Sequence, residues 1–176
     1  MIYDCFTYFN ESEILEIRVN ELIKLNPIHI LVESKYTFTG KEKPLNYADG
    51  NVKYNNLINF CAEVPNNGDP WANEHAQRNY IKSALIQAGV KDDDIIIISD
   101  VDEIPDKDIL SCIKNKQFVV DNIYSLEQDL YLYTITNKAL NNWRFAKILT
   151  YNLLKDQTIK KIRETNECGR KCPLTY

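Results

Sequence analysis

Residues 95–105 read IIIISDVDEIP, and this stretch decides the fold class of the chain. Four consecutive isoleucines predict a strand that is buried on both faces, which is typical of a parallel sheet covered by helices. The strand leads into Asp100, Asp102 and Glu103, so we expect these carboxylates at the carboxyl edge of the sheet. Open α/β sheets bind ligands at that edge, and the turn is therefore the first candidate for a functional site.

The three carboxylates of this turn would repel one another if they lay close together. A divalent cation relieves such repulsion, and oxygen ligands favour Mg²⁺ or Mn²⁺. We therefore expect the three carboxylates together to bind a metal ion, and a phosphate ester to be held through that ion. A simpler alternative is that the carboxylates cap a helix beginning near Pro105. An EF-hand is excluded, because Ile104 and Pro105 stand where that loop needs an oxygen ligand and a glycine.

Strands and helices alternate on both sides of the isoleucine strand. We predict further strands at residues 2–6, 28–33 and 57–64, and helices from residue 10 to the stop at Asn26-Pro27, at 71–88 and at 105–114. The polar segment 35–54 is expected to be a functional loop. Residues 123–135 suit a long strand or a hairpin, and 143–154 suit either helix or strand. The alternation predicts an α/β domain with a mostly parallel central sheet flanked by helices.

Length and composition indicate one domain, residues 1–176, with 44% hydrophobic residues. A net charge of -4 gives no general attraction to nucleic acid or to an anionic membrane. The first residues show neither a signal peptide nor a membrane span, so a cytoplasmic location is expected. The odd number of cysteines, five, favours reduced thiols. Cys168 and Cys172 have the spacing of half a zinc site, but no second Cys/His pair completes it.

An aspartate-nucleophile phosphatase is a rival interpretation of the same turn. Such enzymes also place an Asp-x-Asp pair directly after a buried strand, so that Asp100 would attack and Asp102 would act as acid and base. They also need a hydroxyl residue shortly after the pair, where this chain has Ile104 and Pro105. No later acidic pair for magnesium is evident, so this stays a minor alternative.

Four ordered segments of the chain together resemble glycosyltransferase family 17. They are YDCFTYFNESEILEIRVNEL (residues 3–22), ILVESKYTFTGKEKPL (30–45), WANEHAQRN (71–79) and DDDIIIISDVDEIP (92–105). The likeness implies a GT-A-type fold and an inverting transfer of N-acetylglucosamine from UDP-GlcNAc to a glycan acceptor, through a β-1,4 linkage. It implies Mn²⁺ or Mg²⁺ on Asp102, with Asp100 reaching toward the ribose or the metal. Glu103 would support the metal or touch the sugar.

The resemblance also implies donor contacts from the second strand and from the loop that follows it. Glu33 and Ser34 would contact uracil or ribose, with a surface salt bridge as the alternative for Glu33. Lys41 and Lys43 would reach the diphosphate as point charges, or would be ordinary solvated loop lysines.

A helix in the 71–79 segment carries the remaining candidate donor contacts. Gln77 and Arg78 are expected to face the donor, and Glu74 and Arg78, one turn apart, are expected to pair. Trp71 is expected to be a packing anchor rather than a platform for a sugar.

The acceptor end of the reaction is less defined. An inverting transferase needs a carboxylate base, and Glu127 and Asp129 are candidates, although the polar face of an edge strand explains them equally well. Family members continue into a segment with Gly-Trp-His that has no match here, so we expect a C-terminally shortened domain. A non-catalytic relative that keeps donor binding is therefore an open alternative.

Overall fold

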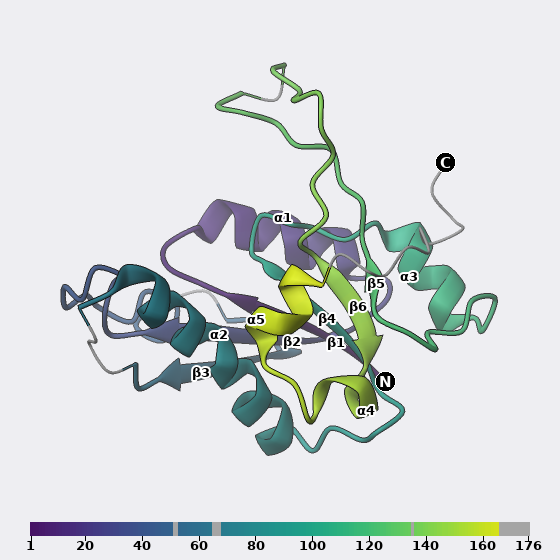
Figure 1. Cartoon of the computed structure of the whole chain (residues 1–176), viewed down its shortest axis with the longest axis horizontal. Helices are drawn as coiled ribbons and strands as arrows, with labels where there is room; N and C mark the ends of the chain where they lie inside the picture. Colours follow the sequence, from purple (N-terminus) through teal and green to yellow (C-terminus); the bar gives the residue numbers. More distant parts are fainter. Residues whose placement is uncertain (51–52, 65–67, 135, 166–176) are drawn as a thin grey trace.

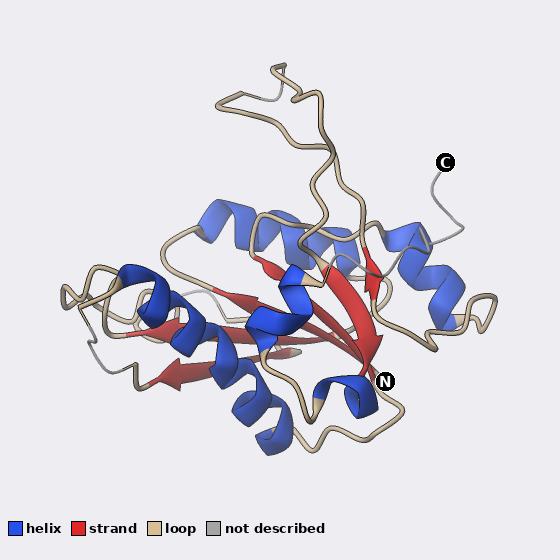
Figure 2. Cartoon of the chain, in the orientation of Figure 1, coloured by secondary structure: helices blue, strands red, loops and turns tan. Residues whose placement is uncertain are grey.

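The computed structural model describes residues 1–50, 53–64, 68–134 and 136–165. Figures 1 and 2 show strands and helices arranged as a sheet with helices on both faces. The elements in chain order are β1 (Ile2–Thr7), α1 (Ser12–Leu22), β2 (Ile28–Ser34), β3 (Leu57–Ala62), α2 (Pro70–Gln87), β4 (Ile95–Asp100), α3 (Lys107–Lys114), β5 (Tyr124–Ser125), β6 (Lys147–Thr150), α4 (Tyr151–Leu154) and α5 (Ile159–Glu164).

The sheet has six strands in the order β3-β2-β1-β4-β6-β5. The first four strands of the chain are mutually parallel, and β6 runs antiparallel to both β4 and β5. The chain winds outward from β1 through β2 to β3, and then returns to place β4 on the other side of β1. This reversal creates a topological switch point between β1 and β4, where open α/β sheets form a ligand crevice.

The isoleucine strand β4 is buried on both faces, as predicted. Ile96 and Ile98 join a cluster with Leu85 of α2, while Ile97 joins a second cluster with Leu110 of α3. All three isoleucines are fully buried. The α/β class and the mostly parallel, helix-flanked sheet are therefore confirmed.

Two helix starts differ from the sequence prediction. Helix α1 begins at Ser12 rather than at residue 10, because the Glu11 carboxylate accepts hydrogen bonds from the backbone N–H groups of Phe9 and Asn10. Helix α3 begins at Lys107 and is capped by Asp106, whose side chain accepts from the N–H of Asp108 at 2.7 Å. The alternative that the three carboxylates after β4 serve as its cap is therefore wrong.

Residues 123–150 form less regular structure than a long strand. Only β5 and, at the end of the range, β6 join the sheet, and between these two strands the chain leaves the body as a projecting arm (Figure 1). Isolated bridges at Gln128–Trp143 and Tyr131–Lys138 pair the two sides of this arm, which supports the hairpin alternative. The 143–154 region is divided between β6 and α4.

In the part of the chain that the structure describes, no helix has the length and apolar character needed to cross a lipid bilayer.

Candidate functional site

A cavity of about 570 Å³ opens at the switch point between β1 and β4. Thr7, Tyr8 and Phe9 line it from the end of β1, and Asp100 and Asp102 line it from the end of β4. The residues that follow adjacent parallel strands meet here because both strands end at the same edge of the sheet.

A buried arginine holds the turn after β4 in place. Arg18 is fully buried in α1, and its Nη1 donates to the backbone carbonyls of Asp100, Val101 and Glu103 at 3.0–3.1 Å. Its Nε donates to Asp4 of β1 at 2.8 Å. Burial alone would raise the pKa of Asp4, but the Arg18 guanidinium outweighs burial and holds that pKa well below its usual range. The conformation of the turn is thus set from inside the core.

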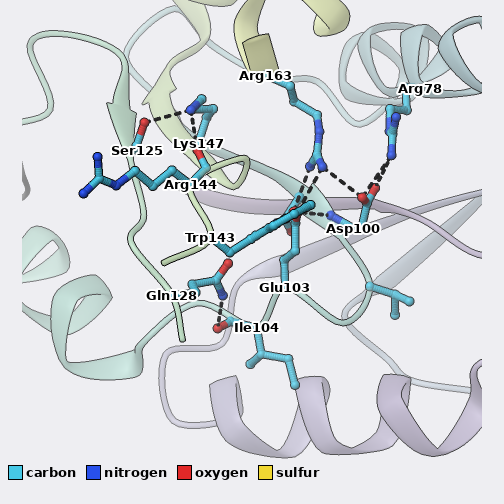
Figure 3. A network of polar contacts seen from close by, with 12 residues as sticks. Arg78, Asp100, Glu103, Ile104, Ser125, Gln128, Trp143, Arg144, Lys147 and Arg163 are labelled. Atoms are coloured by element: carbon cyan, nitrogen blue, oxygen red, sulfur yellow. Dashed lines mark hydrogen bonds and ion pairs between the residues drawn. The ribbon is translucent and has the colours of Figure 1, made fainter. Parts of the chain in front are cut away.

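Arginines neutralise two of the three carboxylates at this turn (Figure 3). Arg78 Nη2 donates to both oxygens of Asp100 at 2.8 and 2.9 Å, and Arg163 Nη2 donates to Asp100 Oδ2 at 2.9 Å. Arg163 also makes a two-pronged contact with buried Glu103, at 2.8 and 3.0 Å. Trp143 Nε1 completes the set by donating to Glu103 Oε1.

This network corrects the expectation that the three carboxylates gather around one cation. Glu103 turns inward, accepts from the backbone N–H of Asp100 at 2.7 Å, and is 6% exposed. Across residues 1–50, 53–64, 68–134 and 136–165, no group of three or more His, Cys, Asp or Glu side chains is placed to hold a metal ion. The mutual repulsion is instead relieved by guanidinium groups from α2 and α5.

Asp102 differs from its two neighbours because its carboxylate is exposed and borders the cavity. Partial desolvation raises the pKa of Asp102, and the negative charges of Asp100 and Glu103 raise it further. An exposed carboxylate that borders a cavity and has no arginine partner among the described residues is a favourable position for a cation.

Glu33 and Ser34 are both fully buried, so the alternative of a surface salt bridge for Glu33 is wrong. Glu33 accepts from the backbone N–H groups of Tyr47 and Ala48 at 3.2 and 2.9 Å, and from Asn59 Nδ2 at 2.9 Å. Ser34 Oγ accepts from the N–H of Tyr36 at 3.0 Å. In this arrangement the two side chains organise the 35–54 loop.

The loop itself borders the cavity, as expected for a functional loop. Tyr36, Phe38 and Lys43 line the cavity, whereas Lys41 is exposed and does not line it. Lys43 Nζ lies 5.2 Å from the ring centroid of Phe9, and partial burial lowers its pKa. Of the two candidate lysines, only Lys43 is therefore placed to meet a bound anion.

Helix α2 supplies the opposite wall. Gln77 and Arg78 both line the cavity, but the Gln77 amide donates to the backbone carbonyl of Val32 at 3.0 Å and so anchors α2 to β2. The predicted Glu74–Arg78 pair is present. Trp71 is 68% exposed, so the expectation that it anchors packing is wrong.

The two candidate base residues lie on the other side of the turn. Glu127 accepts from Arg144 at 3.3 Å, and Asp129 pairs with Lys138 at 2.7 Å. Both border a separate polar cavity of about 670 Å³ that Asp102 also borders. They therefore share a cavity with Asp102, but each is engaged by a basic partner.

Three residues of the site were not predicted from the sequence: Arg18, Trp143 and Arg163. Arg18 was the easiest to detect, since a basic residue stands next to Val19 on the apolar side of a predicted helix. Arg163 lies 60 residues from Glu103 in the sequence, so only the folded chain pairs them. Cys168 and Cys172 lie outside the described residues.

A profile described as glycosyltransferase family 17 matches residues 1–172 of the chain. The chain belongs to glycosyltransferase family 17. Membership of a glycosyltransferase family argues against the aspartate-nucleophile phosphatase, as does the engagement of both Asp100 oxygens by arginine.

Two curated relatives are named beta-1,4-mannosyl-glycoprotein 4-beta-N-acetylglucosaminyltransferase, one from Homo sapiens and one from Rattus norvegicus. Each is 28% identical to this family 17 chain over 114 residues, which cover 56% of the chain. The match covers 21% of the human protein and 20% of the rat protein, so the chain spans about a fifth of the length of these relatives.

Proposed function

We propose that this family 17 chain is a metal-dependent inverting glycosyltransferase of the GT-A type, which transfers N-acetylglucosamine from UDP-GlcNAc to a glycan acceptor. One observation carries the proposal: the switch-point cavity ends at an exposed carboxylate, Asp102, held on a turn that is fixed from the core. The names of the human and rat relatives support the choice of N-acetylglucosamine and of a β-1,4 linkage.

The residues of the cavity fit a cation that is bound together with its substrate. Mg²⁺ and similar ions are commonly held by one or two carboxylates, with substrate phosphates supplying the remaining ligands. Asp102 is the carboxylate that would hold such an ion here, and Asp100 lies beside it on the cavity wall. Bound there, Mn²⁺ or Mg²⁺ would neutralise the charge that develops on the departing UDP.

The chain's own residues would place positively charged side chains around the negative charge of the departing UDP. Lys43 offers a point charge toward a diphosphate, and Arg78 presents a guanidinium at the opposite wall. Arg163 and Glu103 hold Asp100, while Arg18 holds the backbone of the turn, so the carboxylates need no reorganisation when the donor binds.

The test is a thermal-shift and calorimetric titration of the purified protein with UDP-GlcNAc, with and without Mn²⁺. A ligand present at a hundred times its Kd stabilises the folded state by about 2.7 kcal/mol. We expect stabilisation that requires Mn²⁺ and is lost in Asp102→Asn. The matched control is Asp93→Asn, an exposed carboxylate before the opposite end of β4, which should leave binding unchanged.

Two results would contradict the proposal in different ways. Metal-dependent binding that is unchanged in Asp102→Asn would reject the assigned metal ligand. Tight donor binding without donor hydrolysis or sugar transfer would favour the alternative of a non-catalytic relative that retains the donor site.

A further inference from the structure

A second cavity, of about 330 Å³, lies next to the switch-point cavity. Glu74, Arg78 and Asp100 line both cavities, so the two cavities are adjacent at these three side chains. A ligand in the second cavity would therefore lie next to a donor in the first cavity, close to the Arg78–Asp100 ion pair.

Three large aromatic side chains contribute to the walls of the second cavity. Trp71, Trp143 and Phe145 all line it, and the rings of Trp143 and Phe145 lie 4.7 Å apart between centroids. Trp71 is 68% exposed and Phe145 is 40% exposed. Exposed aromatic surface that gathers at a concavity with a polar rim is typical of a binding site.

The charges around this cavity balance. Its acidic lining residues are Glu74, Asp100 and Glu164, and its basic lining residues are Arg78, Lys160 and Arg163. Balanced charge gives no net attraction to a phosphate, but it supplies hydrogen-bond donors and acceptors beside the aromatic planes. A pyranose ring has an apolar face of C–H bonds and an edge of hydroxyl groups, which matches that combination.

We propose that the second cavity is the subsite for the acceptor saccharide, stacked on Trp71 and Phe145 and bordered by Trp143. The proposal rests on the proposed transferase function, because the two cavities meet at Glu74, Arg78 and Asp100 and an acceptor in the second cavity would lie beside a donor in the first. Trp143 also donates to Glu103, so the aromatic wall is joined directly to the turn that carries Asp100 and Asp102.

The chain contains two tryptophans, and both line this cavity. Intrinsic tryptophan fluorescence is therefore a reporter of this subsite. We would titrate the full chain, saturated with Mn²⁺ and UDP, with methyl β-mannopyranoside, methyl β-N-acetylglucosaminide and di-N-acetylchitobiose into the millimolar range. At least one of these saccharides is expected to change the emission saturably.

Variants test whether the aromatic walls are responsible. Trp71→Ala and Phe145→Ala should each weaken saccharide binding about tenfold, because each loses a stacking surface. Binding of UDP-GlcNAc with Mn²⁺ should stay within about twofold of the parent in both variants. Tyr133→Ala, which removes a fully exposed ring on the projecting arm, is the matched control and should leave the binding of both saccharide and UDP-GlcNAc unchanged.

Three outcomes would overturn the assignment. A flat titration with every saccharide would reject it, as would saccharide binding that is unchanged in both aromatic variants. A fluorescence change with UDP-GlcNAc that UDP does not produce, while the free saccharides stay silent, would show that the cavity holds the donor's own sugar. Failure of the proposed function is distinct, because it would appear as loss of metal-dependent UDP-GlcNAc binding at the other cavity.

Discussion

The ion pair between Arg163 and Glu103 should make a large contribution to stability, because both partners are removed from water. The side chain of Arg163 is 7% exposed and that of Glu103 is 6% exposed. Removing one partner of a buried pair leaves an uncompensated charge, which typically costs about 3–5 kcal/mol. We therefore expect Arg163→Met to lower the free energy of unfolding by about 3–5 kcal/mol, measured by urea denaturation at pH 7.

A matched control and a double-mutant cycle separate this effect from the loss of a helical residue. Lys161→Met also replaces a basic residue with methionine, at an exposed position of α5, and should cost no more than about 0.5 kcal/mol. In the Arg163→Met/Glu103→Gln double variant, the second substitution removes the stranded charge. The combined loss should therefore be clearly smaller than the sum of the two single losses.

Two results would contradict this prediction: a loss in Arg163→Met no larger than that in Lys161→Met, or additive losses from the substitutions at Arg163 and Glu103. Either result would mean that Glu103 is solvated or is neutralised by another group in solution.

Three further outcomes follow from the packing of the chain. The folded state lowers the pKa of Asp4, so the ionised Asp4 carboxylate stabilises the fold above about pH 4, and this stabilisation is lost as the pH falls. The acid-induced decrease in unfolding free energy should therefore be shallower in Asp4→Asn than in the parent protein. Burial raises the pKa of the Cys5 thiol and blocks access to it, so alkylation followed by peptide mass spectrometry should label exposed Cys61 before Cys5, and Cys5 should react only after unfolding. Leu110→Ala should lower the unfolding free energy by about 2–5 kcal/mol in chemical denaturation, because the side chain is fully buried between α3 and the sheet.

The regular core was predictable because its signals are local. The isoleucine run specifies a strand buried on both faces, and Gly89 stands after the apolar periodicity of α2, where its φ of +75° suits glycine. The predicted Glu74–Arg78 pair needed only helical spacing. The arm after β5 was harder to predict, since its leucines and tyrosines resemble a strand but leave the sheet, and Leu132 is 44% exposed.

The site was only partly predictable, because charge neutralisation comes from distant segments. The sequence predicted that Asp100, Asp102 and Glu103 would lie at the carboxyl edge of the sheet, and they do. It could not show that Arg78 and Arg163 would take the place of a cation at Asp100 and Glu103. It also could not show that Glu33, at the end of β2, would turn into the core and bind the backbone of its own loop.

By itself, the sequence determined the α/β class, the buried central strand and the acidic turn at its end, because hydrophobic periodicity and strand termination are properties of neighbouring residues. Only the tertiary structure decided which carboxylate stays free. Arg18, Arg78 and Arg163 reach the turn from α1, α2 and α5, and they leave Asp102 as the exposed acid of the three. The physical reason is that a buried charge must be paired, and its partner can come from any element that the fold brings within reach.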